Sequence, residues 1–457
     1  MFHSYARVRW ALPLSFALTA LAFTVPAASA APHESAPVRD DFNGDGYADL
    51  AVGAPNGTAG GQSAAGYVTV MYGGPHGLST SRRANISRAT TGIPGASVKG
   101  QGFGLQLSKG DLDGDGYADL VIGSKAQQDG AVVVWGGRSG LSGGRSLPAT
   151  ASQTADFDGD GRLDLALFRA GFAGGDDPIG TTATIWKGPL KRSGVPAAKT
   201  PLDPGYLQYL DVRDGDTGDI NGDHRADLVL TGYCGDGSHC STLYLSSPSG
   251  LRRVTGQHPG GDGAVAIGDV NGDAYDDLLT GFEDDNSVWV MYGSAAGLGG
   301  QETWASYTQN TPGVPGSKEE YDRFGAAIAV GDITGDGIDD VAVGVPGEND
   351  EGVVNVLRGS RAGLTGTGAQ SFGQNTRNVP GTAEKYDAFG GTVRLLDIDG
   401  NGHADLAADA PWEDNGNGAV WVLRGSSSGV VTDAALSFGG KAVGAPYSKA
   451  AFGFALK

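Results

Sequence analysis

The chain is poor in cysteine, methionine and basic residues. Its 457 residues include only 2 Cys and 3 Met, and 32 Lys and Arg stand against 52 Asp and Glu. The formal charge of −20 argues against nucleic acid as a partner, because binding to the phosphate backbone needs an excess of positive charge. The same acidic excess suits cation binding or simple solubility.

Long apolar runs are missing beyond residue 30, so we expect no membrane-spanning segment there. Residues 1–30 begin with two arginines and no acid, continue with the apolar run "ALPLSFALTALAFTV" and end in small residues at Ala28 and Ala30. This pattern predicts a secretory signal peptide cleaved after Ala30. A membrane anchor is the alternative, but the run is short for one. We therefore expect residues 31–457 to form a single secreted, extracellular domain.

The two cysteines lie close together in "GYCGDGSHCSTLY". An exported protein meets an oxidising compartment, so we predict a disulfide bond between Cys234 and Cys240. A metal site that also uses His239 is the alternative, but this spacing matches no standard zinc motif.

Signatures of catalysis are also missing. The sequence contains neither an HExxH motif nor a Walker loop. The segment "GSSSG" at residues 425–429 fits the G-x-S-x-G pattern, but it corresponds to the turns "GSAAG" and "GSRAG" found elsewhere in the chain. We predict no catalytic residue, and an enzyme is the less favoured interpretation.

Glycine is abundant, with 79 residues, and long stretches of good helix formers are rare. Such a composition favours many short strands joined by tight turns. An Asp-rich segment of ten residues recurs seven times, as in "DLDGDGYADL" from Asp111. Asp stands at positions 1 and 9 in every copy, Gly at position 4, and apolar residues at positions 2 and 10. Strand-like runs follow each copy, about four strands in roughly 61 residues, which is typical of a propeller blade.

The Asp-rich segments predict calcium loops. Calcium prefers six to eight oxygen ligands, and a compact loop can supply them from side chains at positions 1, 3, 5 and 9 and from the backbone carbonyl of position 7. Asx-rich turns without metal are the alternative. Position 12 lacks the bidentate Glu of an EF-hand, and the following residues resemble a strand, so we expect strand–loop–strand sites for up to seven calcium ions.

The predicted calcium ligands, loop by loop, are Asp41, Asn43, Asp45, Tyr47 and Asp49; Asp111, Asp113, Asp115, Tyr117 and Asp119; Asp156, Asp158, Asp160, Arg162 and Asp164; Asp219, Asn221, Asp223, Arg225 and Asp227; Asp269, Asn271, Asp273, Tyr275 and Asp277; Asp332, Thr334, Asp336, Ile338 and Asp340; and Asp397, Asp399, Asn401, His403 and Asp405. The second and third loops carry four carboxylates each and are the strongest candidates.

A Phe-Gly pair precedes three of these loops at a fixed spacing. Phe103, Phe324 and Phe389 each lie eight residues before position 1 of a loop. Together with "DDFNGDGYADLAVGAP", this arrangement resembles the FG-GAP repeat of integrin alpha subunits and of many bacterial secreted proteins. The resemblance implies an all-β fold, a seven-bladed β-propeller, with the calcium loops on one rim between the first two strands of each blade. The third, fourth and fifth blades lack a clear Phe-Gly pair.

The two ends of the repeat array complement each other. The loop at Asp41 has no Phe-Gly strand before it, and the Phe-Gly strand at Phe452 has no loop after it. We therefore expect the C-terminal strand to pair with the N-terminal blade and close the ring, which leaves no exposed sheet edge. Phe452 and Phe454 should be buried there.

The opposite rim is acidic and carries aromatic residues in the last blades. The predicted ligand-binding residues are Trp412, Glu413, Asp414, Tyr321 and Tyr386. Solvated loops without a ligand are the alternative. The favoured function is a monomeric, calcium-binding adhesion module for an extracellular ligand such as a glycan or a surface or matrix protein. The alternatives are a secreted hydrolase or enzyme accessory that acts on glycans or phospholipids, and a structural coat component.

Overall fold

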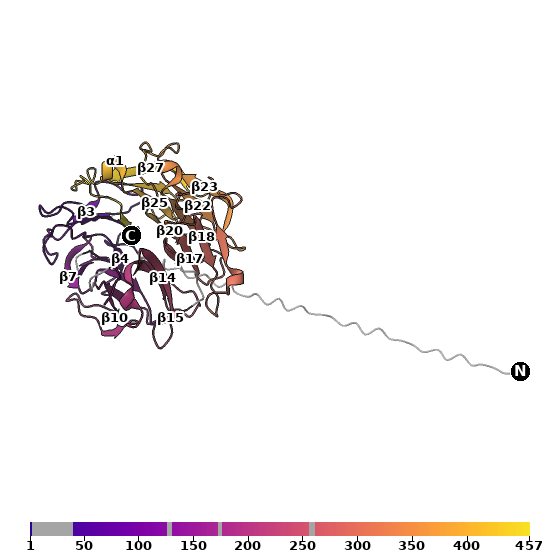
Figure 1. The fold of residues 1–457 in the computed structure, drawn as a ribbon, viewed down its shortest axis with the longest axis horizontal. Coiled ribbons are helices and arrows are strands. Elements are labelled where there is room, and N and C mark those ends of the chain that lie inside the picture. Colours follow the sequence, from indigo (N-terminus) through magenta and orange to yellow (C-terminus); the bar gives the residue numbers. More distant parts are fainter. Residues whose placement is uncertain (2–39, 126–129, 172–175, 256–260) are drawn as a thin grey trace. The chain divides into compact units, whose positions relative to one another are not determined.

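The computed structural model describes Met1 and residues 40–125, 130–171, 176–255 and 261–457. The signal peptide expected at residues 1–30 lies, beyond Met1, outside the described residues. From residue 40 onward the chain folds into seven four-stranded antiparallel sheets, which form a ring as the blades of a β-propeller (Figure 1). The predicted fold class is confirmed.

Each blade begins with an inner strand and proceeds outward through three more strands. From the inside outward, the blades are β28 (Ala455–Leu456), β1 (Leu50–Ala54), β2 (Tyr67–Met71) and β3 (Arg83–Ile86); β4 (Leu107–Gly110), β5 (Asp119–Ile122), β6 (Ala131–Trp135) and β7 (Ser142–Leu147); β8 (Ala151–Ala155), β9 (Asp164–Arg169), β10 (Thr182–Lys187) and β11 (Ala198–Pro201); β12 (Asp211–Gly218), β13 (Asp227–Gly235), β14 (Ser238–Leu245) and β15 (Arg252–Val254); β16 (Val265–Gly268), β17 (Asp277–Phe282), β18 (Ser287–Met291) and β19 (Ala305–Tyr307); β20 (Ala327–Gly331), β21 (Asp340–Val345), β22 (Val353–Arg358) and β23 (Thr365–Phe372); and β24 (Val393–Leu396), β25 (Asp405–Ala410), β26 (Ala419–Arg424) and β27 (Val431–Gly439).

Within the described ranges, helical structure is confined to single turns. They are η1 (Leu207–Tyr209), η2 (Gln301–Thr303), η3 (Glu348–Asp350) and α1 (Glu413–Gly416). None of the helices in the described ranges has the length and apolar character that a bilayer crossing requires.

The core is divided among the interfaces between neighbouring blades. Each of the seven apolar clusters draws its buried residues from two adjacent blades, so that the clusters follow one another around the ring. The second strand of each blade is buried on both faces; β1, for example, shows no exposed residue from Leu50 to Ala54. Burial on both faces explains why these strands are continuous apolar runs without alternation.

The last strand closes the ring as predicted. In β28, Ala455 and Leu456 pair with Gly53 and Val52 of β1, and the C-terminal end lies among the inner strands (Figure 1). Phe452 is fully buried and packs edge-on against Phe438, with ring centroids 5.9 Å apart. The prediction for Phe454 was wrong: its side chain remains 41% exposed and lines a central cavity described below.

The Phe-Gly pairs lie in turns that precede the inner strands, and not within the strands as the sequence suggested. All four phenylalanines, at positions 103, 324, 389 and 452, are fully buried. The following glycine has a left-handed backbone, with φ of +92° at Gly104, and a Cβ there would stand 2.7 Å from the carbonyl oxygen of Tyr67. A strand cannot include this conformation, and only glycine adopts it without strain.

Candidate functional site

Six of the seven Asp-rich loops connect the inner strand of a blade to its second strand, and the loop from Asp41 leads into β1, the second strand of the first blade, whose inner strand β28 comes from the C-terminal end. Because the inner strands are equivalent in every blade, all seven loops lie on the same rim of the ring, as predicted. The residues at position 2, from Phe42 to Ile398, are buried, and so are those at position 10. These apolar anchors fix both ends of each loop in the interblade core.

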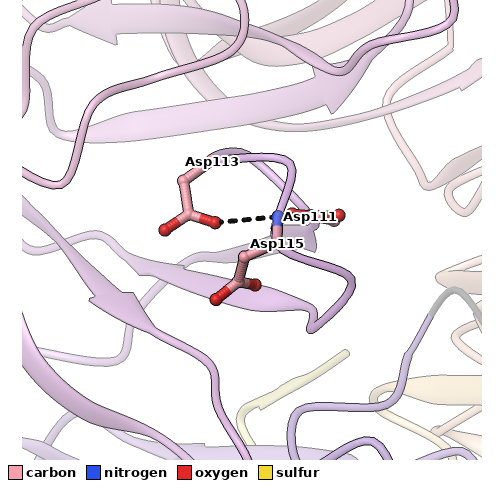
Figure 2. A group of neighbouring side chains, drawn as sticks. All are labelled: Asp111, Asp113 and Asp115. Carbon is pink, nitrogen blue, oxygen red and sulfur yellow. Dashed lines mark hydrogen bonds between the residues drawn. The ribbon is translucent and has the colours of Figure 1, made fainter.

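The carboxylate at position 1 organises its loop. In all seven loops one carboxylate oxygen accepts a hydrogen bond from the backbone N–H of position 5, and the other accepts one from position 6. In the second loop these donors are 3.1 and 2.9 Å from the oxygens of Asp111. Asp113 accepts a further bond of 3.2 Å from the backbone of Asp115, so the three carboxylates surround one tight turn (Figure 2).

Three loops bring their carboxylates together. Single oxygens of three carboxylates lie within 4.8 Å of one another in the groups Asp111, Asp113 and Asp115; Asp156, Asp158 and Asp164; and Asp397, Asp399 and Asp405. Within the described residues, the other four loops form no such group. The difference follows from position 3, which is Asp in these three loops and Asn or Thr in the others.

The Asp at position 9 has a structural role that the sequence did not reveal. Asp49, for example, accepts one hydrogen bond from the backbone of Phe42 and a second from Gly73, beyond the third strand, each at 2.9 Å. The same pair of bonds ties the loop start to the end of the third strand around Asp119, Asp227, Asp277 and Asp405. Burial raises the pKa of Asp49 to about 7 in the metal-free protein.

Neighbouring loops touch each other through positions 4 and 7. A Cβ on Gly44 would stand 2.5 Å from the ring of Tyr117, and one on Gly400 would stand 2.9 Å from Tyr47 across the closing seam. Positions 4 and 7 also meet between the loops in the pairs Gly159–Arg225, Gly222–Tyr275, Gly272–Ile338 and Gly335–His403. Sequence reasoning assigned position 7 only a carbonyl ligand and missed this packing. The contact favours glycine at position 4 in six loops; at Gly114 the nearest atom is 3.9 Å away, and there the backbone, with φ of +77°, favours glycine.

Position 6 has a left-handed backbone in every loop. Five loops place glycine there, but His224 has φ of +62° and Ala274 has φ of +70°. Residues other than glycine pay a conformational penalty in this region.

Basic side chains contact several of the loop carboxylates. The Arg192 guanidinium lies 2.5 Å from oxygens of both Asp113 and Asp115. Lys187 makes the equivalent contacts to positions 3 and 5 of the third loop, Arg82 pairs with Asp45, and Arg424 pairs with Asp399. In the described part of the chain, no ion pair reaches the fifth and sixth loops, which begin at Asp269 and Asp332. No local pattern in the sequence predicts these contacts, because the basic residues lie outside the loops that they contact and approach them only in the folded chain.

The predicted ligand rim exposes its aromatic side chains. Tyr321 is 77% exposed, Tyr386 70% and Trp412 49%. Trp412 and Tyr386 line one open pocket of ≈ 780 Å³ together with Lys385 and Lys449, whereas Tyr321, Glu413 and Asp414 are not among its lining residues.

Glu413 is turned away from that surface. It accepts a hydrogen bond of 2.6 Å from the Gln374 amide, and burial beside Asp387 raises its pKa to about 7. Asp414 remains exposed.

The two cysteines are bonded to each other. Cys234 and Cys240 lie on the hairpin of β13 and β14 with their Cα atoms 6.0 Å apart. The predicted disulfide is present in the structure, and both sulfurs are unavailable as metal ligands.

Comparison with known proteins agrees with this architecture. The FG-GAP repeat family matches residues 35–71, 103–135, 324–357 and 389–423, which lie in the first, second, sixth and seventh blades. Integrin alpha pat-2 of Caenorhabditis briggsae is 34% identical over 234 residues, 46% of this chain and 18% of that protein. Integrin alpha-4 of Xenopus laevis is 31% identical over 175 residues, 32% of this chain and 14% of that protein.

A third relative is a phospholipase and not an integrin. Phosphatidylinositol-glycan-specific phospholipase D of Mus musculus is 29% identical over 169 residues, 33% of this chain and 20% of that protein. The matched region therefore spans a fifth or less of each of these relatives. The repeats in four places, the seven blades and these similarities agree: the chain carries FG-GAP repeats and is similar to the integrin alpha chains.

Proposed function

We propose that the protein is a secreted, calcium-stabilised propeller that acts as a binding or adhesion module for an extracellular ligand. The observation that carries the proposal is the sevenfold repetition of one oxygen-rich turn on one rim of the ring. The names of its integrin alpha relatives support an extracellular binding role.

The donor chemistry of the loops suits calcium. Side-chain oxygens of Asp, Asn and Thr, with the carbonyl of position 7, are the hard ligands that calcium prefers. In the seventh loop, Asp399 is almost fully buried, and neither of its carboxylate oxygens accepts a hydrogen bond within the described residues. Its ion pair with Arg424, like that of Lys187 in the third loop, indicates that these clusters attract positive charge. Up to seven ions would be held, each by positions 1, 3, 5, 7 and 9 of its loop.

Calcium should therefore stabilise the fold. Each independent site adds about 2.7 kcal/mol to the free energy of unfolding at a free calcium concentration of about 100 times Kd. Extracellular modules bind calcium with Kd of about 10⁻⁴–10⁻³ M. We expect the melting temperature to fall after exhaustive chelation and to recover on adding millimolar calcium, but not magnesium. An unchanged melting curve after chelation would refute the calcium sites.

We place the ligand on the opposite rim, at the pocket lined by Trp412 and Tyr386. Tyr386 and Tyr321 both have φ of +73°, although an equivalent turn before Phe103 uses Gly100. Exposed aromatics in a backbone region that favours glycine carry a conformational cost, which suggests selection for a surface role. Two aromatic faces beside Lys385 and Lys449 suit a glycan or a polar protein surface.

The ligand proposal is tested by a binding screen against glycans and against surface and matrix proteins, with and without calcium. The variant Trp412→Ala should weaken the binding that the screen finds by at least tenfold, at an unchanged melting temperature. Tyr209→Ala, which removes another exposed aromatic from a different blade, is the matched control. Wild-type affinity in Trp412→Ala would exclude this pocket. A large loss of stability would mean that Trp412 is a packing residue.

The second candidate function is a secreted hydrolase or enzyme accessory that acts on glycans or phospholipids through the propeller rim. It is favoured by the similarity to the phospholipase D, over 33% of this chain. Hydrolysis of glycans or phospholipids by the purified chain would support it over the adhesion module.

A further inference from the structure

The inner strands enclose a cavity on the axis of the propeller. Its volume is ≈ 690 Å³, and its wall includes residues of β4, β8, β12, β16, β20, β24 and β28, one inner strand from each blade. Neither the calcium loops nor the aromatic pocket on the rim contributes to this wall. We call it the central cavity.

The charges of the central cavity are separated by sign. Asp214 and Asp216 come from β12, whereas Arg394 comes from β24 and Lys457 follows β28. Inner strands of successive blades are neighbours in the ring. The blade of β12 stands three blades from that of β24 in one direction and three from that of β28 in the other. The two carboxylates therefore face the two cations from opposite sides of the cavity.

These charged groups have few partners within the protein. In the described ranges no carboxylate lies within 4.0 Å of the Arg394 guanidinium or the Lys457 ammonium, and Arg394 donates one hydrogen bond of 2.9 Å to the carbonyl of Leu456. Asp216 accepts one bond, of 3.0 Å, from the backbone of Ile267. Among the described side chains, the Gln153 amide donates to Asp214, at 3.5 Å. Both pairs thus retain hydrogen-bonding capacity for a ligand.

The other charged residues on the wall are engaged or lie at its edge. Arg213 pairs with Asp211 and stacks over the ring of Tyr233, and Lys125 is exposed. Lys109, a neighbour of Lys457, is paired with Asp40 at 2.8 Å. Among the described residues, the wall charges without an ion-pair partner are thus Arg394 and Lys457 on one side, Asp214 and Asp216 on the other, and the exposed Lys125.

An apolar surface lies beside the cationic pair. Phe454 is 41% exposed, although Phe438 and Phe452 of the closing seam are buried, and its side chain lines the cavity. Leu107, Val212 and Val393 add further apolar wall. An exposed aromatic ring at this place offers contact area for an uncharged part of a ligand.

The lowered pKa of Lys457 favours binding of an anion beside it. Burial, together with the charge of Arg394, lowers the pKa of Lys457 to about 8, while Asp214 and Asp216 act in the opposite direction. At pH 7 the Lys457 side chain is still mainly charged, but its charged form is destabilised. A bound anion would stabilise that charged form.

We propose that the central cavity binds a small zwitterion, with its anionic group at Arg394 and Lys457, its ammonium group at Asp214 and Asp216, and an apolar part against Phe454. Since the two pairs lie on opposite sides of the ring, the charges of the ligand must be further apart than in one amino acid. Short peptides with free termini have this chemistry, and the cavity volume accommodates two or three residues.

The test uses isothermal titration calorimetry at pH 7 with four probes. They are the tripeptide Ala-Phe-Ala, its N-acetyl form, its C-terminal amide and free phenylalanine. The unmodified tripeptide should bind, and each of the other probes should bind at least tenfold more weakly. Absence of binding by the tripeptide at millimolar concentration would overturn the proposal, and so would equal affinity for a probe that lacks one of the separated charges.

Variants assign each end of the ligand to its side of the cavity. Asp214→Asn should remove the preference for the free tripeptide over its N-acetyl form. The double variant Arg394→Met/Lys457→Met should remove the preference over the C-terminal amide. Arg138→Met, which changes an exposed residue on the outside of the second blade, is the control. If both cavity variants keep wild-type preferences with unchanged melting temperatures, the proposed orientation is wrong.

Discussion

At the residue scale, each Asp-rich loop depends on positions that tolerate a left-handed backbone. Position 6 has φ between +62° and +89° in all seven loops, and its N–H donates to the carboxylate of position 1. In the two loops where another residue takes the place of glycine at position 6, the backbone keeps the left-handed conformation at a conformational cost. Since the bond to position 1 is present in every loop, the loop geometry outweighs the local preference of His224 and Ala274.

We expect Ala274→Gly to stabilise the protein. The left-handed conformation costs a residue with a Cβ roughly 1–2 kcal/mol, which glycine avoids, whereas the greater entropy of glycine in the unfolded chain offsets about 0.5–1 kcal/mol. The free energy of unfolding should rise by up to about 1.5 kcal/mol, measured by chemical denaturation in chelator so that no metal contributes. Ala362→Gly, in an exposed turn outside these loops, serves as a control and should not stabilise. A decrease in stability for Ala274→Gly would contradict the assignment of strain.

A second residue-scale prediction concerns Asp409 in β25. Its side chain is fully buried, one oxygen accepts a hydrogen bond from the backbone of Thr392, and the other has no hydrogen-bond partner in the described ranges. Burial raises its pKa well above the ordinary value. The folded protein therefore keeps a proton that the unfolded chain loses above a pH of about 3.9, and stability decreases as the pH rises, by at most about 1.4 kcal/mol per unit, until the folded pKa is reached.

Asp409→Asn should remove this pH dependence. We expect a higher melting temperature than wild type at pH 8 and little difference at pH 4, followed by thermal unfolding across that range. Asp433→Asn, at an exposed position of β27, should change neither value. Equal melting temperatures of Asp409→Asn and wild type at pH 8 would mean that the carboxyl group ionises without cost.

At the element scale, strands of one blade supply basic groups to loops of the same or a neighbouring blade. Arg192 follows β10 of the third blade yet contacts Asp113 and Asp115 of the second. The second and third loops, with the most carboxylates, are thus also those in which a basic side chain bridges two predicted ligands. Calcium would have to displace these side chains, whereas the fifth and sixth loops face no such competition among the described residues.

Arg192→Met should therefore have opposite effects with and without calcium. In chelator the carboxylates of the second loop lose their counter-ion, and we expect a loss of up to about 1 kcal/mol, since the pair is partly exposed and screened. On titration with calcium the variant should gain more stability than wild type, measured as the shift in melting temperature. Arg145→Met, an exposed arginine away from the loops, is the control. A smaller calcium shift in Arg192→Met would mean that the arginine supports the ion instead.

The elements also show where sequence reasoning succeeded and where it could not. Periodic features with a local cause were predictable: the loop positions, the apolar anchors and the strand order all recur in each blade. Contacts between blades were not, because position 7 packs on a glycine of another loop that lies between 53 and 73 residues away in sequence, or 353 residues away across the seam, and Arg192 reaches its partners from another blade. Phe454 was misjudged because it sits in the same short segment as Phe452 but faces the central cavity.

At the scale of the whole molecule, the ring is held by interactions that pass from blade to blade. The backbone N–H of position 8 donates to the carbonyl of position 1 in the preceding loop, as from Ala118 to Asp41 at 2.9 Å, and the same bond crosses the seam from Ala48 to Asp397. A second series of bonds runs from the residues after the third strand to the carbonyl of position 2 in the preceding loop, as from Gly137 to Phe42 at 3.1 Å and from Leu190 to Leu112 at 2.6 Å. Because every blade depends on both neighbours, opening the ring at one place exposes apolar surface on two blades.

Deleting residues 451–457 should open the seam. The deletion removes β28, leaves the edge of β1 unpaired and uncovers the cluster that joins the first and last blades. An unpaired edge beside an exposed apolar face promotes association with other chains. We expect aggregation or failed secretion, assessed by the yield of monomer in size-exclusion chromatography. A monomeric protein with the wild-type melting curve would show that the ring does not need this strand.

Two point substitutions in the same segment distinguish the effect of ring closure on stability from the effect of deleting seven residues. Phe452 is fully buried and contacts both the first and the last blade through Tyr67 and Phe438, so Phe452→Ala should cost about 3–5 kcal/mol. Phe454, two residues away, is partly exposed, and Phe454→Ala should cost well under half of that. If both variants lose the same stability, the seam is held by the segment as a whole. If only Phe452→Ala loses much stability, and this variant still unfolds in a single cooperative transition, one interblade contact contributes to the stability of all seven blades. A closed ring requires this coupling between the blades.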